Sequence, residues 1–375
     1  MCSVALALLT LAGCGPKDGV KEYESAKAAY AARSLEKAER LFAKSLIYAP
    51  ANVDALVMLA RVQADLGNIP EAKRTIARAV ELQKDSPDVA LLDAEIAFYA
   101  EDYDRAASRF AGVADSAKDG AEAQSLGWTG LGIVEMSRNN RDLARIAFLR
   151  AIRLDRRNAS ARYHLGLLYR GDSFGYLDAA LEQFEIFVRL GDKEKADPRA
   201  THVQRVMIPG IKADIARRAA ERPGASKRDS NAAANALQRA EAAWKKNDFK
   251  RARDEYTAAY RADVLSYPAA LGLAKAWEKT DSTPAGRQRT LDYYKVACAL
   301  RPGAASTFLK AGDLAAKIGQ HATAVELYSR AVAANPSDFS AIDGLIRALR
   351  KVGGQGKTAD AYQRYRDFLS PRKGK

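Results

Sequence analysis

Histidine is the residue whose chemistry would be easiest to assign, because imidazole binds transition metals and transfers protons near neutral pH. The chain has three, His164, His202 and His321, and they are far apart in the sequence. None has a second histidine or a cysteine at the spacing of a zinc-binding motif. The cysteines, Cys2, Cys14 and Cys298, provide neither a metal-ligand set nor a disulfide framework. We therefore expect no metal site.

A second candidate is the turn from Gly353 to Thr358, which ends in the Gly-Lys-Thr of a phosphate-binding loop. Such a loop needs glycine five residues before Gly356, where Lys351 stands, and it must join a strand to a helix. Residues 341–350 have the pattern of a helix, so we interpret the turn as a flexible connection between helices. Motifs for a nucleophile are absent and the carboxylates are dispersed, so we expect no enzyme and no cofactor. A site assembled across distant segments would escape this search.

The composition indicates an all-α protein. Alanine is abundant, β-branched residues are few, and regular alternation is missing. The 375 residues carry a net charge of +14, which favours acidic partners such as lipid headgroups, anionic polysaccharide, acidic proteins or nucleic acid. However, basic and acidic residues are interleaved, as on solvated helix faces. Cys298 lies within a helical pattern and is expected in the core.

Residues 305–336 contain two short amphipathic patterns. Phe308, Ala311, Gly312 and Ala315 share one helical face, and Gly319 interrupts the pattern. A second face then carries Ala324, Tyr328 and Ala331 and ends at Pro336. Spacings of three and four residues predict two helices joined by a tight turn, with small residues where the helices cross. Neither helix can bury its apolar stripe alone, so the unit requires neighbours.

This unit resembles a tetratricopeptide repeat, whose period is about 34 residues. Similar units follow one another at residues 19–50, 53–86, 87–120, 125–158, 159–192, from 233, 267–302, 305–336 and 339–371. The resemblance implies an α-solenoid, a right-handed superhelix of helix-turn-helix repeats, in two arrays. We predict an N-terminal array over residues 19–192 (about five repeats) and a C-terminal array over 231–371 (about four repeats).

The pattern lapses in residues 193–230, which we interpret as a connecting helix followed by a basic, mobile linker. Pro209 and Gly210 interrupt the helical stretch, and residues 222–228 are rich in basic residues. The linker could contact an anionic membrane surface, but a solvated hinge is the simpler interpretation. The tail, residues 372–375, is also basic.

The amino terminus has a short apolar run followed by Leu11-Ala12-Gly13-Cys14. This resembles the lipobox of bacterial lipoproteins, although no lysine or arginine precedes the run. The resemblance implies a cleaved signal peptide (residues 1–13), lipidation of Cys14 and a tether over residues 14–18. It further implies a lipid anchor in the bacterial cell envelope, on the outer membrane and facing the periplasm.

In tetratricopeptide proteins the first helix of each unit lines a groove that receives a peptide. Carried over to this chain, the groove positions are Tyr23, Glu24, Lys27, Tyr30, Met58, Arg61, Glu95, Phe98, Tyr99, Met136, Tyr163, His164 and Arg170. Equivalent positions in the later array are Trp244, Lys310, Asp313, Arg347 and Arg350. Some of these side chains could instead pack between neighbouring helices. Thr129 and Gly130 stand where chaperone-binding relatives carry polar or charged groups, so recognition of a chaperone tail is not expected.

The resemblance therefore predicts a non-enzymatic, membrane-anchored scaffold that binds protein or peptide partners and assists assembly of an envelope or surface complex. The alternative is a component of an export system that binds anionic polysaccharide or lipid headgroups. A third possibility, an enzyme, would require a buried titratable cluster in the fold. Nucleic acid is not an expected partner, because neither a recognition helix nor a basic aromatic strand motif is present. The sequence does not fix the oligomeric state.

Overall fold

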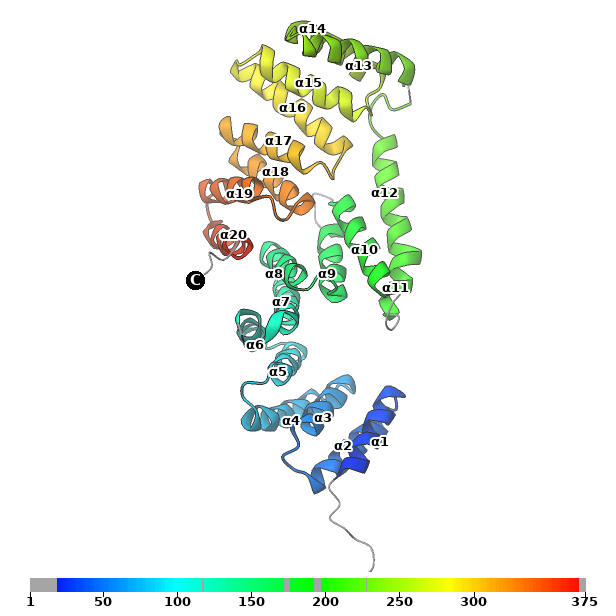
Figure 1. Ribbon diagram of the computed structural model, residues 1–375, viewed down its shortest axis with the longest axis vertical. Coiled ribbons are helices and arrows are strands. Elements are labelled where there is room, and N and C mark those ends of the chain that lie inside the picture. Colours follow the sequence, from blue (N-terminus) through cyan, green and yellow to red (C-terminus); the bar gives the residue numbers. More distant parts are fainter. Residues whose placement is uncertain (1–18, 117, 172–175, 192–196, 227, 371–375) are drawn as a thin grey trace, which may run out of the picture. The chain divides into compact units, whose positions relative to one another are not determined.

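The computed structural model describes residues 19–116, 118–171, 176–191, 197–226 and 228–370, and its regular elements there are all helices (Figure 1). The predicted signal peptide, Cys14, the tether and the basic tail lie outside the described residues. The helices are α1 (Val20–Ala31), α2 (Leu35–Tyr48), α3 (Val53–Asp65), α4 (Ile69–Leu82), α5 (Pro87–Tyr99), α6 (Tyr103–Asp115), α7 (Gly120–Ser137), α8 (Arg141–Leu154), α9 (Ala159–Arg170), α10 (Leu177–Gly191), α11 (Pro198–His202), the π-helical turn η1 (Val203–Met207), α12 (Ile208–Ala220), α13 (Ser230–Lys245), α14 (Phe249–Ala262), α15 (Tyr267–Thr280), α16 (Pro284–Leu300), α17 (Ala305–Lys317), α18 (His321–Ala334), α19 (Phe339–Lys351) and α20 (Gly356–Leu369).

Apart from the segment from α11 to α12, consecutive helices form antiparallel pairs that stack on one another. In the N-terminal part α1 packs on α2, α2 on α3, and so on to α6, while α13 to α20 repeat the same order. The bounds of the pairs follow the predicted units closely, beginning near residues 20, 53, 87, 120 and 159 and again near 230, 267, 305 and 339. The all-α fold of repeated helix pairs is confirmed.

In seven of the helix pairs, the turn contains one residue in the left-handed conformation. Residues with φ between 58° and 82° lie at these turns: Arg33, Gly67, Glu101, Asn139, Asn247, Gly319 and Gly354. At Gly319 the next amide, that of Gln320, donates to the carbonyl of Ala315, which satisfies a carbonyl that the helix end would leave unpaired. The predicted break of the helix at Gly319 is therefore the turn of its pair.

Aromatic rings on second helices lie against glycines on first helices. A Cβ atom added to Gly166 would lie 2.7 Å from Cε1 of Phe184, and one added to Gly312 would lie 2.8 Å from Cδ1 of Tyr328. Phe184 and Tyr328 are both buried. Only glycine leaves room for the ring at these crossings, as the pattern of small residues predicted.

Contacts divide the chain into two compact units, residues 1–134 and 135–375. Each unit is described by itself below. The predicted arrays, residues 19–192 and 231–371, were defined by which residues belong to repeats, whereas the two units are defined by contacts. The ends of the arrays therefore stay a prediction.

The segment between the arrays, residues 193–230, differs from the expected kinked helix and mobile linker. Helix α12 runs through Gly210 with Pro209 in its first turn, where proline is tolerated, and the irregularity is the π-helical turn just before it. Beyond α12, Arg222 donates a hydrogen bond of 2.6 Å to the carbonyl of Ala299 in α16, and Ala225 is buried. Arg222 and Ala225 of the described part of the linker are thus held in place, while most of its other described residues are exposed.

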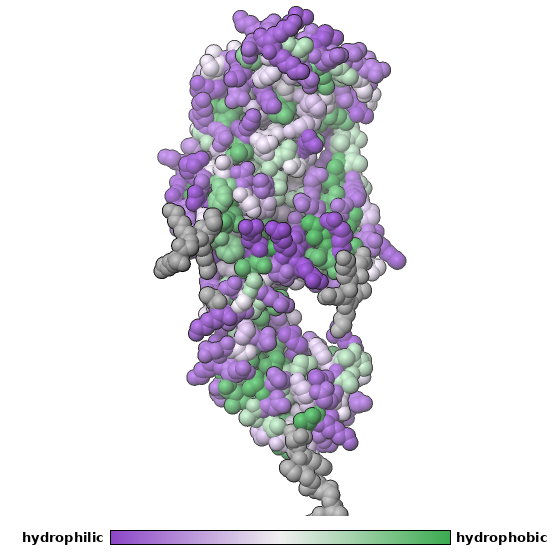
Figure 2. All heavy atoms as spheres, viewed as in Figure 1, coloured by the Kyte–Doolittle hydropathy of each residue, from purple (hydrophilic) through white to green (hydrophobic). Residues whose placement is uncertain are grey.

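On the face shown in Figure 2, hydrophilic and hydrophobic residues are interspersed. Within the described ranges, no helix combines the length and the hydrophobicity needed to cross a bilayer.

Candidate partner-binding surface

The first helices of the first three pairs, α1, α3 and α5, carry nine of the predicted groove residues. They are Tyr23, Glu24, Lys27 and Tyr30 on α1, Met58 and Arg61 on α3, and Glu95, Phe98 and Tyr99 on α5. Helices α3 and α5 contact each other directly. We call the surface formed by these residues, together with Asp54 and Asp65 of α3, the α1–α3–α5 surface.

Two polar contacts join the three helices. The Tyr30 hydroxyl of α1 donates to Oδ2 of Asp65 in α3 over 2.9 Å. On the other side, Nη1 of Arg61 in α3 lies 3.1 Å from Oε2 of Glu95 in α5, with both side chains 38% exposed. Tyr99 lies next to this ion pair, and 60% of its surface is exposed. Four of the predicted residues, Tyr30, Arg61, Glu95 and Tyr99, therefore lie together around Asp65 and the Arg61–Glu95 ion pair.

The surroundings of Tyr30 and Tyr99 raise the pKa values of both side chains. Partial burial raises the pKa of Tyr30, and its hydrogen bond to Asp65 raises it further. Partial burial also raises the pKa of Tyr99, followed by the charges of Glu95 and Asp65. Asp65 is thus close to both tyrosines, and both hydroxyls stay protonated at physiological pH.

Some of the predicted residues also pack against the second helices. The Tyr23 ring lies 5.7 Å from the ring of Phe42 in α2, and Phe98 lies 5.6 Å from Tyr103 at the start of α6. Met58 is partly buried against the same core. Tyr23, Phe98 and Met58 therefore pack against the core beneath the surface, while Tyr30, Arg61 and Tyr99 are more accessible to solvent.

In the second unit, the structure gives Tyr163 and His164 packing roles. The His164 ring stacks on Phe148 of α8 at 5.8 Å, and burial, followed by the charge of Arg199, lowers its pKa to about 4. The Arg199 guanidinium of α11 covers the Tyr163 ring at 4.5 Å. Met136 is half-buried and Arg170 is exposed at the end of α9. Contact of these four residues with a partner stays a prediction.

The C-terminal array has a more polar inner surface. Glu278 in α15 accepts a hydrogen bond of 2.8 Å from Tyr294, and Asp313 in α17 accepts one of 2.7 Å from Tyr328. A cavity of about 350 Å³ adjoins both carboxylates and is also lined by Lys310 and Lys317. Its charges are mixed, and they do not define one ligand.

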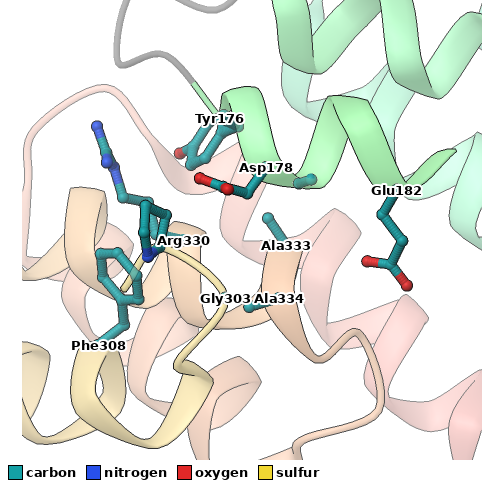
Figure 3. Close-up of a pocket in the computed structure, with 10 residues that line it drawn as sticks. Tyr176, Asp178, Glu182, Gly303, Phe308, Arg330, Ala333 and Ala334 are labelled. Carbon is teal, nitrogen blue, oxygen red and sulfur yellow. The ribbon is translucent and has the colours of Figure 1, made fainter. Parts of the chain in front are cut away.

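A smaller cavity, of about 150 Å³, lies where α10 meets α17 and α18 (Figure 3). Tyr176, Asp178 and Glu182 line it from one side, and Phe308 and Arg330 line it from the other. The Arg330 guanidinium lies 5.2 Å from the centre of the Tyr176 ring. Burial raises the pKa of Asp178. Sequence reasoning missed this cavity, because no repeat pattern indicates which distant pairs meet.

Comparison with known families agrees with the helix pairing. Family models of the tetratricopeptide repeat match residues 29–96 and 129–195. These two stretches are tetratricopeptide repeats. The two matched stretches contain the half-buried residues Tyr30, Arg61 and Glu95 of the α1–α3–α5 surface and the packed residues Tyr163 and His164.

Several solved tetratricopeptide structures are similar over part of the chain. The crystal structure of MamA protein is 20% identical over 47% of this chain and 93% of its own, with a TM-score of 0.37. TTC0263, a tetratricopeptide protein of Thermus thermophilus, is 22% identical over 52% of this chain and 99% of its own, with a TM-score of 0.41. PilF of Pseudomonas aeruginosa is 15% identical over 70% of this chain and 98% of its own, with a TM-score of 0.41. These similarities are too low to support a functional argument, and no curated protein matches the chain.

Proposed function

We propose that this tetratricopeptide protein is a non-enzymatic scaffold that binds protein or peptide partners on its α1–α3–α5 surface. The observation that carries the proposal is the link through Tyr30–Asp65 and Arg61–Glu95, which joins three successive first helices into one patch. The patch holds an exposed tyrosine and an arginine, two residue types that dominate binding energy in protein interfaces.

The second unit contains a buried cluster of titratable side chains, but this cluster does not favour an enzyme. Arg145, Tyr169 and Tyr362 are buried together between helices of the second unit, and Asp142 contacts Arg145 and Tyr362. Burial raises the pKa of Tyr169 and of Tyr362 far from neutrality, so neither hydroxyl can exchange a proton readily at physiological pH. The cluster is better explained as packing that fixes the last helix pair.

The lipid anchor at Cys14 and the location on the outer membrane, facing the periplasm of a bacterial envelope, belong to the same proposal. Their support is the sequence Leu11-Ala12-Gly13-Cys14 after a short apolar run. The test is Cys14→Ser: the unchanged chain should carry acyl mass and fractionate with membranes, whereas the variant should carry none and be released. A variant that stays on the membrane without acyl mass would contradict the anchor.

The partner surface is tested by co-purification from detergent-solubilised membranes. Tyr99→Ala should reduce the recovered partners by about tenfold, since truncating an interface hot spot costs about 1–2 kcal/mol or more. The matched control is Ile47→Ala in α2, which removes an apolar side chain that is 73% exposed and lies outside the patch. Equal recovery with both variants would contradict the proposed surface.

Binding of anionic polysaccharide or lipid headgroups is the second candidate, and the net charge of +14 favours it. Binding dominated by charge should collapse in moderate salt, because exposed charges are screened within about 8 Å at physiological ionic strength. Binding through the aromatic part of the patch should persist. Partner recovery at low and moderate salt therefore separates the two candidates.

A further inference from the structure

The α1–α3–α5 surface has a charge pattern that differs from that of the whole chain. Two of its cations are already paired: Lys27 lies 2.8 Å from Glu24, and Arg61 lies 3.1 Å from Glu95. Two carboxylates remain at the ends of α3, Asp54 and Asp65, and both are exposed. Although the chain carries +14, this surface presents acidic groups in excess of its paired cations.

One end of the surface already shows how it holds a cation. The Lys27 ammonium lies 5.1 Å from the centre of the Tyr23 ring while Glu24 pairs with it at 2.8 Å. A cation over an aromatic face with a carboxylate beside it is a stable arrangement, because the ring quadrupole and the anion attract the same charge.

An aromatic ring and a carboxylate recur together two helical turns further along α1, but α1 supplies no cation there. Tyr30 holds Asp65 at 2.9 Å, and Asp65 is also near enough to Tyr99 to raise the pKa of that phenol together with burial and Glu95. The carboxylate thus accepts a hydrogen bond from Tyr30 of α1 and is near enough to Tyr99 of α5 for its charge to act on that side chain. Two cations of the chain act on Tyr30, and both lower its pKa: Arg61, which is held by Glu95, and Arg33 in the turn after α1.

We infer that the partner segment bound by the α1–α3–α5 surface is basic and places a lysine or arginine side chain at Asp65, between Tyr30 and Tyr99. The inference rests on the proposed function and adds the charge of the partner. It runs against the chain's net charge, which by itself would select an acidic partner. Electrostatic complementarity at such a patch gives specificity as well as encounter rate.

The test uses the purified full-length chain in detergent and three labelled peptides of 12 residues. The peptides have one framework, with lysine, glutamine or glutamate at the same alternating positions, and binding is followed by fluorescence anisotropy. The lysine peptide should bind at least tenfold more tightly than either of the others. Asp65→Asn should weaken it by about three- to tenfold, because the amide keeps the size of the side chain and an acceptor for Tyr30 while removing the charge. Asp85→Asn is the control, an exposed acid of the same unit outside the surface.

Several outcomes would overturn the inference. A glutamate peptide that binds as well as the lysine peptide, a lysine peptide that does not bind, or equal effects of Asp65→Asn and Asp85→Asn would each do so. If the glutamate or glutamine peptide binds and Tyr99→Ala abolishes that binding, the scaffold function stands and only the partner's charge is wrong. If Tyr99→Ala changes neither peptide binding nor partner recovery from membranes, the proposed surface itself fails.

Discussion

The Arg145 guanidinium of α8 donates a hydrogen bond to the Tyr362 hydroxyl of α20, although 217 residues separate them in the sequence. Arg145 is 5% exposed in its side chain, and Tyr362 is fully buried. The Tyr362 hydroxyl in turn donates to Oδ1 of Asp142 over 3.5 Å, and Asp142 pairs with Arg145. Helices α8 and α20 also contact each other directly, so the last helix pair is fastened to a helix from the middle of the chain (Figure 1).

Replacing Tyr362 by phenylalanine should destabilise the second unit. The ring would still fill its place, but the buried Arg145 would lose an acceptor, and an unsatisfied buried polar group costs about 1–3 kcal/mol. The free energy of unfolding, measured by denaturant titration, should fall by that amount. Tyr99→Phe is the matched control and should stay within about 0.5 kcal/mol of the unchanged chain, because its hydroxyl is on an exposed side chain. Equal effects would show that the Arg145 contact contributes nothing.

Gly344 in α19 should not tolerate alanine, even though alanine is the better helix former. A Cβ atom there would lie 2.4 Å from Cε1 of Tyr328, and one added to Gly312 on the neighbouring helix would lie 2.8 Å from Cδ1 of the same ring. The ring cannot swing away freely, since its hydroxyl donates to Asp313 over 2.7 Å. Overpacking of this kind costs about 1–3 kcal/mol, which outweighs the gain of about 0.5–1 kcal/mol expected for Gly→Ala inside a helix.

Thermal or denaturant unfolding of Gly344→Ala checks this. The control is Gly353→Ala, at an exposed turn position where a Cβ atom would have no neighbour within 4 Å. It should change the free energy of unfolding by no more than about 0.5 kcal/mol. A Gly344→Ala chain as stable as the control would mean that the helix crossing adapts without cost.

The helix pairs could be predicted because their determinants are local. The spacing of Gly312, Ala315 and Tyr328 reflects which faces of two consecutive helices meet, and Gly319 supplies the turn between them. A period in the sequence carries no information about contacts between distant pairs. For that reason, the Arg145–Tyr362 contact and the cavity beside Arg330 were not predicted.

The predicted surface shows the same division. Positions 30, 61 and 99 could be assigned to one surface because equivalent positions in successive repeats lie on the same face of the first helix. At Tyr163 and His164 the pattern was equally good, but Arg199 of α11 covers Tyr163. Nothing in the repeat pattern of residues 159–192 indicated that the following segment would pack there. The basic character of residues 222–228 likewise did not indicate that Arg222 hydrogen-bonds to the carbonyl of Ala299, because charge alone does not identify a packing contact.

His164 should make the stability of the second unit depend on pH. Burial, followed by the charge of Arg199, lowers its pKa to about 4 in the folded chain, against about 6.5 in the unfolded chain. Between these values the unfolded chain binds more protons, so lowering the pH favours unfolding. The contribution is fully present above pH 6.5 and should fall by about 2 kcal/mol between pH 7.5 and pH 5.

His164→Gln is the variant that tests it, because glutamine does not titrate while the carboxylates remain in both chains. The free energy of unfolding of each chain is measured at several pH values, and the difference between the two curves isolates the histidine. At pH 7.5 the variant should be less stable than the unchanged chain by the free energy of the missing stack on Phe148. This difference in the free energy of unfolding should shrink steadily as the pH falls, because only the unchanged chain must keep an imidazole neutral when it folds. A constant difference between the curves would show that the imidazole at α9 accepts its proton as readily in the folded chain as in the unfolded one.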